Sequence, residues 1–311
     1  MRHVLFDSTG RLRNGWWALA FIALLVPLMI GQYWLQTLLR YIGVPRGGWQ
    51  LGLVTLATFA CTWACTRLRR EPLTSVGFRL DRRWLREVGL GTALGIGQML
   101  AAVSMIAALG GVRMELNPEW SRWALVSGSL LFVVVAIQEE VLFRGFLFQR
   151  LRDGLGAWPA LLVLAALFTL AHEDNPGMEP ATQLVATLDL ALGGIVLGLA
   201  YLRTRSLALP IGIHFGWNWM QGSILGFAVS GTAASGVLHP TILGRSEWLT
   251  GGAFGVEASV FSVVVDTCAL VLLLCWKPGA AAPEPAASSD LGALGVLAVQ
   301  FPSGIRSTDT E

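Results

Sequence analysis

Long apolar runs separated by short, arginine-containing polar stretches dominate this chain of 311 residues. Most of the runs approach the length of about twenty residues that a helix needs to cross the hydrocarbon core of a bilayer. The pattern predicts eight membrane-spanning helices, at residues 16–39, 51–66, 88–112, 123–143, 157–170, 184–202, 207–227 and 253–276. Within them, the pairs Gly91/Gly95 and Gly194/Gly198 have the spacing that lets two helices approach closely.

Composition agrees with a membrane protein. Hydrophobic residues make up 54% of the chain and charged residues 14%, where a soluble domain carries about 25% charged residues. The mean hydropathy is +0.61. These values disfavour a soluble enzyme, a disordered chain and a disulfide scaffold. The net charge of +2 is small and scattered, so no nucleic-acid partner is expected. The fold class predicted is an all-α polytopic bundle of about eight transmembrane helices.

The basic residues predict an orientation. When the connections are assigned alternately to the two sides of the membrane, 17 of the 22 basic residues fall on one side and 5 on the other. Basic loops stay predominantly in the cytoplasm. The chain is therefore expected to be a multi-pass protein of the cell inner (plasma) membrane, with membrane lipids as partners and both termini in the cytoplasm.

Four regions follow from the same pattern. Residues 1–122 hold the N-terminal transmembrane helices, residues 123–230 the core with the candidate chemistry, and residues 231–277 the last transmembrane helix. Residues 278–311 are rich in Ala, Pro and Ser and are expected to form a disordered cytoplasmic tail.

Ionisable side chains inside apolar segments are costly and therefore suggest function. Glu139, Glu140 and Arg144 end the fourth predicted span. Residues four apart share a helix face, so Glu140 and Arg144 are expected to form an ion pair. Glu139 is rotated about 100° from Glu140 and is free to face a cavity.

The other candidate residues are a histidine pair and an asparagine. His172 follows the fifth span, one helical turn after Phe168, and His214 and Asn218 share one face of the seventh. A carboxylate can deprotonate water, a histidine can orient that water, and an imidazole and a carboxamide can stabilise an oxyanion. The same set could instead hold a metal such as zinc through His172, His214 and a carboxylate. The sequence leaves both mechanisms open.

Each of these residues also has a structural interpretation. Glu140 with Arg144 is most simply a buried pair at a helix end, a lone histidine such as His172 is more often interfacial, and His214 with Asn218 could join two helices by hydrogen bonds. Two further acids, Asp189 and Asp266, lie in apolar spans, where one could line a cavity and the other bond to backbone or face water. The joint recurrence of the three polar sets favours a shared site.

The three motifs together resemble a known family. E-E-x-x-x-R at Glu139 to Arg144, F-x-x-x-H at Phe168 to His172 and H-x-x-x-N at His214 to Asn218 resemble the CPBP family of intramembrane CAAX proteases and bacteriocin-processing proteins, also called type II CAAX prenyl endopeptidases or the Abi family. The resemblance covers residues 123–227. It implies helices around a central cavity open to the cytoplasm.

The resemblance also implies roles. Glu139 would activate water with His172, His214 and Asn218 would form the oxyanion hole, and Glu140 with Arg144 would hold the helix in place. The leading hypothesis is an intramembrane endopeptidase acting on a membrane-associated or lipid-modified, CAAX-like peptide, dependent on the glutamate or on a metal. The alternatives are a non-catalytic membrane scaffold of the same fold and a proton-coupled transporter that uses Glu139, His172 and Asp189 as a relay.

Overall fold

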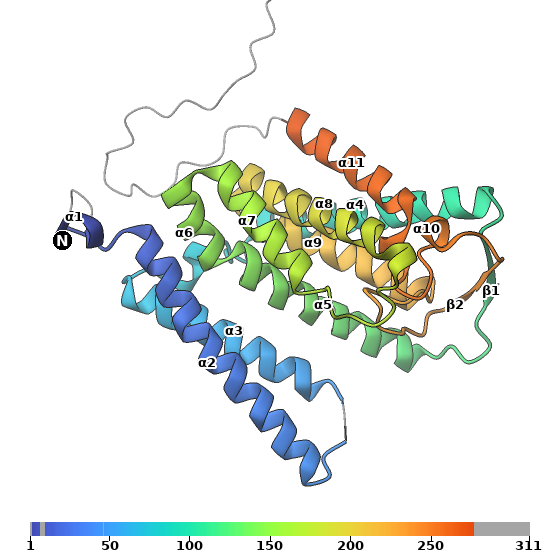
Figure 1. The fold of residues 1–311 in the computed structure, drawn as a ribbon, viewed down its shortest axis with the longest axis horizontal. Coiled ribbons are helices and arrows are strands. Elements are labelled where there is room, and N and C mark those ends of the chain that lie inside the picture. The colour runs from blue at the N-terminus through green and yellow to red at the C-terminus, as the bar shows by residue number, and fades with distance from the viewer. Residues whose placement is uncertain (1, 7–9, 46, 277–311) are drawn as a thin grey trace, which may run out of the picture. The chain divides into compact units, whose positions relative to one another are not determined.

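The computed structural model describes residues 2–6, 10–45 and 47–276. The long helices in chain order are α2 (Asn14–Tyr41), α3 (Trp49–Leu68), α4 (Arg82–Ala108), α5 (Arg122–Arg144), α6 (Phe146–Leu155), α7 (Ala157–Leu170), α8 (Pro180–Thr204), α9 (Ala208–Asn218) and α11 (Val260–Cys275). The short helices are α1 (Arg2–Leu5) and α10 (Glu247–Thr250), with 3₁₀ turns at Leu73–Val76 and Val256–Ala258. A π-helical turn, Trp219–Ile224, continues α9. Figure 1 shows α4, α5, α7, α8, α9 and α11 gathered in one bundle.

The predicted helical bundle is confirmed. Every predicted span contains a helix, and five stretches of the described chain are long and apolar enough to cross a membrane. They are Asn14–Tyr41, Trp49–Leu68, Arg82–Ala108, Arg122–Leu155 and Pro180–Thr204, while Ala157–Leu170 and Val260–Cys275 are shorter apolar helices. The count of eight spans stays a prediction, and the predicted tail lies outside the described residues.

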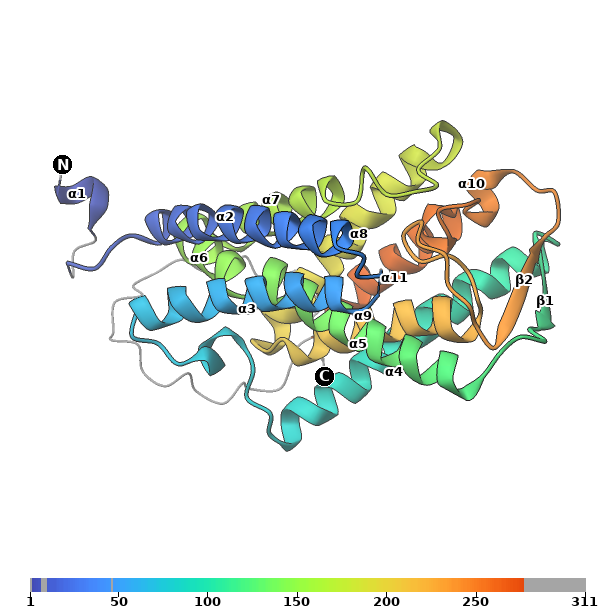
Figure 2. The ribbon, with the colours of Figure 1, turned by 90° about the horizontal axis from the view of Figure 1, so that it is seen from below.

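Two features differ from the predicted pattern. A two-stranded antiparallel sheet joins β1 (Val112–Leu116) to β2 (Leu238–Ile242), with Met114 opposite Pro240. Figure 2 shows it at the end of the bundle opposite α6. The last helix begins at Val260 rather than Ala253, because Gly251, Gly252 and Gly255 hold positive φ angles that a helix does not use.

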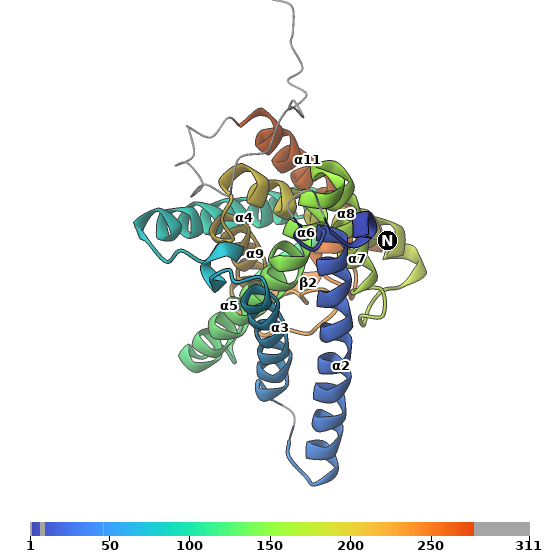
Figure 3. The ribbon, with the colours of Figure 1, turned by 90° about the vertical axis from the view of Figure 1, so that its left-hand side faces the viewer.

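Helix α2 shows how the apolar surface is used. It pairs with α3 in an antiparallel hairpin (Figure 3), yet only Ala18 and Phe21 of its 28 residues are buried. Large side chains such as Leu19, Ile30 and Trp34 are more than half exposed. An apolar surface of this size is stable in contact with lipid, so the chain is a multi-pass membrane protein.

Close backbone contact between α4 and α9 fixes the helix that carries His214. A side chain at Gly91 or Gly95 would meet the backbone of α9, and one at Gly212 or Gly216 would meet the backbone of α4. The small-residue spacing at Gly91/Gly95 therefore has the packing role expected from sequence. Its counterpart on α9 is part of the same contact.

A helix break at Gly145 fixes how far Glu139 and Glu140 lie from the end of α5. The backbone leaves helical geometry there (ψ −130°), while its N–H still bonds the Val141 carbonyl. Any Cβ at this position would meet that same carbonyl. Helix α5 thus ends at Arg144, which leaves Glu139 only about 8 Å from the helix end at 1.5 Å per residue. A separate short helix, α6, follows the break.

Candidate active site

One cavity of about 1020 Å³ brings the predicted residues of three helices together. Glu139 from α5, His172 from the segment after α7, and His214 and Asn218 from α9 all line it. Glu140 and Arg144 do not line the cavity and lie behind it, with 0% and 1% of their surface exposed. The cavity predicted at the centre of the bundle is therefore present.

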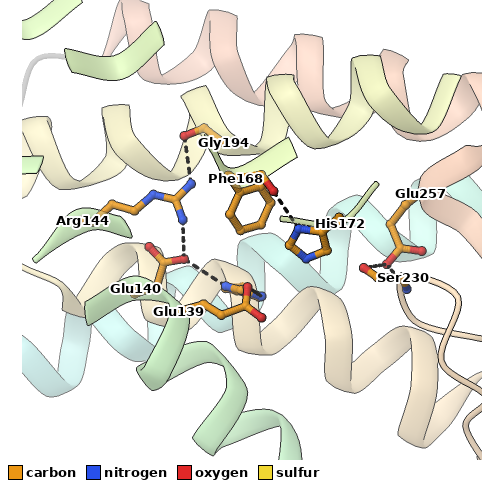
Figure 4. Close-up of polar contacts among 9 residues, drawn as sticks. Glu139, Glu140, Arg144, Phe168, His172, Gly194, Ser230 and Glu257 are labelled. Carbon is orange, nitrogen blue, oxygen red and sulfur yellow. Dashed lines mark hydrogen bonds and ion pairs between the residues drawn. The ribbon is translucent and has the colours of Figure 1, made fainter. Parts of the chain in front are cut away.

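The buried pair is tied into neighbouring helices (Figure 4). Glu140 Oε1 accepts hydrogen bonds from Arg144 Nη1 at 3.0 Å and from His214 Nδ1 at 2.9 Å. Arg144 Nη2 donates to the Gly194 carbonyl of α8 at 3.0 Å. The expected i,i+4 ion pair is present, and it also fixes α5 to α8 and α9. A carboxylate only accepts, so His214 Nδ1 must carry the proton.

Glu139 is in a different situation from its neighbour. Its carboxylate makes no hydrogen bond within the described residues, and its Oε2 lies 3.7 Å from His214 Nε2. The side chain is 20% exposed and faces the cavity. The helical period that separates adjacent side chains by about 100° therefore puts one carboxylate in the core and the other in the cavity.

His172 is oriented by its own helix end. Its Nδ1 donates to the Phe168 carbonyl at 2.8 Å, which leaves Nε2 of the neutral ring with a free lone pair. The ring of Phe168 lies 4.6 Å from the His172 ring and 6.4 Å from the His214 ring, measured between centroids. The Arg144 guanidinium lies 4.9 Å from the centroid of the Phe168 ring. Phe168 thus packs against both imidazoles and the buried cation.

Asn218 lines the cavity one turn after His214 and is 8% exposed. No hydrogen bond to its carboxamide is formed within the described residues, so the amide is available to a bound molecule. Both groups therefore present polar hydrogens to the same space when His214 Nε2 is protonated.

Sequence reasoning missed Glu257. It lines the same cavity, accepts hydrogen bonds from the N–H and hydroxyl of Ser230, and also pairs with Gln221. Burial raises the pKa of the Glu257 carboxyl to about 7, against the effect of these hydrogen bonds. An acid inside the predicted span 253–276 was the available signal. The contact of Arg144 with Gly194 had no local signal, because α5 and α8 meet only in the tertiary structure.

A metal site is not formed by these side chains. Within residues 2–6, 10–45 and 47–276 no three His, Cys, Asp or Glu side chains are grouped to hold a metal ion. The three-ligand set considered from sequence is therefore not grouped in this part of the chain, and no step below is routed through a metal.

Comparison with known proteins agrees with the site. Residues 121–220 match the family model described as type II CAAX prenyl endopeptidase Rce1-like. The matched segment is about a third of the chain and contains all six predicted site residues. The match supports a CPBP-family intramembrane protease, and it confirms the resemblance seen in the motifs. No curated protein and no solved structure gives a significant match.

Proposed function

We propose that this protein is an intramembrane endopeptidase in which Glu139 activates the attacking water. One observation carries the proposal, which is the difference between two adjacent glutamates. Glu140 is fully buried and accepts hydrogen bonds from Arg144 and His214. Glu139 makes no hydrogen bond within the described residues and faces a cavity that two histidines also line. A general base needs this freedom, since it must reach the water proton that it removes.

The reaction follows from the side chains in the cavity. Water bound by Glu139 and by the lone pair of His172 Nε2 attacks the carbonyl carbon of the peptide, and Glu139 takes one proton. The tetrahedral intermediate then breaks at the C–N bond, and the proton from Glu139 passes to the leaving amine. The products are a new carboxyl terminus and a new amine, so atoms and charges balance.

Oxyanion stabilisation falls to His214 and Asn218. Because His214 Nδ1 already donates to Glu140, its Nε2 can donate to an oxyanion only as the imidazolium. The buried carboxylate of Glu140 favours that positive charge. Glu140 and Arg144 are therefore positioning residues, which hold His214 and the end of α5 without touching the substrate.

The substrate class follows from the surroundings of the cavity. The site lies among long apolar helices, and the family match supports a membrane-associated, prenylated peptide in general. Cavity-lining Trp123, Leu130 and Leu131 are at least 43% exposed, so the cavity wall continues into the lipid-facing surface of α5. We propose a membrane-associated or lipid-modified peptide as substrate.

The orientation is a separate proposal. The arginine asymmetry assigns both termini to the cytoplasm, but the cavity lining runs from Glu139 toward Trp123, at the arginine-poor end of α5. The family resemblance implies a cavity open to the cytoplasm instead. Labelling of a Ser127→Cys variant, without other cysteines, by a membrane-impermeant maleimide decides which of these two expectations is wrong.

The activity is tested with purified full-length protein in detergent and in liposomes. Prenylated and unmodified membrane peptides are incubated with wild type, Glu139→Gln and the exposed control Glu119→Gln, and products are read by mass spectrometry. We expect one cleavage position with wild type and the control. Removing the base should lower the rate by about 10²–10⁴-fold. Unchanged cleavage by Glu139→Gln would falsify the assigned role. If the Glu139→Gln variant keeps the cellular function of the protein, the scaffold alternative is favoured instead.

A further inference from the structure

A second polar cluster lies in the same cavity, away from the proposed catalytic residues. It consists of Asp189 on α8, Asp266 on α11 and Gln98 on α4, all of which line the cavity. The two aspartates are 4% and 6% exposed. Neither touches the residues that the reaction above uses, so the mechanism leaves two buried acids unexplained.

The two carboxylates are close together. Asp266 Oδ1 accepts a hydrogen bond from Gln98 Nε2 at 3.0 Å. Its Oδ2 lies 3.3 Å from where a Cβ of Gly193 would be, and Gly193 is one helical turn after Asp189. Asp189 and Asp266 are near enough for their charges to repel. Two buried acids this close together are stabilised by a proton on one of them or by a bound cation.

The protein supplies no cation there. Asp189 Oδ1 is buried and has no hydrogen-bond partner in the described residues. No lysine or arginine is found among the described residues that line the cavity. Arg144, the buried cation on α5, is already bonded to Glu140 and to the Gly194 carbonyl of α8. Asp189 Oδ1 is therefore an acceptor without a partner, on a residue that lines the cavity.

The chemistry of the cluster favours an organic cation over a metal ion. The described residues hold no group of three acids or histidines suited to a metal. A pair of carboxylates with a neutral amide is instead a suitable set of acceptors for an ammonium or guanidinium group. We propose that Asp189 and Asp266 form a subsite that binds a lysine or arginine side chain of the substrate.

The subsite restricts the substrate. Its position beside the scissile bond rests on the proposed function, whereas the binding of a cation does not. The described lining of the cavity holds no lysine or arginine, and the reaction proposed above uses both of its histidines, so a peptide with a basic residue near the scissile bond suits this cavity.

The test measures binding separately from cleavage. Fluorescent apolar peptides of about eight residues, amidated at the C-terminus, carry either one lysine or norleucine at the same position. Their Kd for the full chain in detergent is measured with the Glu139→Gln background, which prevents turnover. The subsite variants are Asp189→Asn and Asp266→Asn, of which the second keeps an oxygen for Gln98. Glu119→Gln, an exposed acid outside the cavity, is the control.

We expect the lysine peptide to bind on the order of tenfold more tightly than the norleucine peptide, the lower end for a close charge pair. Each aspartate variant should bring the two affinities within about twofold, through weaker binding of the lysine peptide alone. Equal binding of both peptides by wild type, no binding of either, or a preference that survives both variants overturns the proposal. A preference without cleavage by the protein with native Glu139 refutes the proposed function and leaves the subsite. Cleavage by the protein with native Glu139, without a preference for the lysine peptide, refutes the subsite and leaves the proposed function.

Discussion

The adjacent glutamates predict two opposite mutant phenotypes from one chemical change. Glu140→Gln keeps the shape of the side chain and an oxygen in place of Oε1, so the bonds from Arg144 and His214 can form, but it removes the charge. Glu140 and Arg144 are 0% and 1% exposed. Breaking a buried ion pair from one side costs about 3–5 kcal/mol, because the remaining charge is uncompensated.

The lower end of that range applies here. The hydrogen bonds are retained, and Glu139 is near enough to Arg144 to compensate part of its charge. We therefore expect a loss of about 3 kcal/mol in the free energy of unfolding, or on the order of 100-fold in the unfolding constant. Glu140 Oε2 has no partner in the described residues, so the new amide nitrogen is also buried without an acceptor.

The assay is equilibrium unfolding of the purified protein by SDS in mixed micelles, followed by circular dichroism. Glu139→Gln is the matched control, since it makes the same change one residue earlier at a side chain that is 20% exposed and has no hydrogen bond. Its free energy of unfolding should stay within about 0.5 kcal/mol of wild type. Equal stabilities of the two variants, or greater loss in Glu139→Gln, would refute the division into a structural and a free carboxylate.

Three further changes test the packing and the oxyanion hole. Asn218→Ala should lower kcat by about 10²–10³-fold in a peptide cleavage assay with little change in KM, as the loss of one oxyanion donor does. Gly95→Val should prevent a monodisperse fold on gel filtration, because its side chain meets the Ile213 backbone, whereas Gly97→Val on the same helix has open space and should fold. Phe168→Ala should cost about 3–5 kcal/mol in SDS unfolding, since the ring is 6% exposed and supports both imidazoles.

Local periodicity explains what sequence reasoning predicted well. Apolar runs predicted the helices because a bilayer requires every backbone polar group to bond within its own segment. The period of 3.6 residues also predicted the pairing of Glu140 with Arg144 and the separate direction of Glu139. Predictions that compare residues on one helix need no knowledge of its neighbours.

The missed features all depend on contacts between distant segments. The strand pairing of residues 112–116 with 238–242 carries no clear apolar signal, since the strands are short and only Val112 of their residues is buried. Glu257 was missed because its role follows from Ser230 and Gln221, which are 27 and 36 residues away in the chain.

The sequence alone determined the helical segments, the resemblance to the CPBP family and the set of polar side chains that lie within apolar segments. Only the tertiary structure decided which of them meet: it bonds His214 to Glu140 and Arg144 to the backbone of α8, and it leaves Asp189 Oδ1 without a hydrogen-bond partner among the described residues. The physical reason is the difference in range between the two kinds of contact. Positions on one helix are related by its fixed geometry, whereas contacts between helices depend on close packing, such as the glycine contact of α4 with α9, that no single segment encodes.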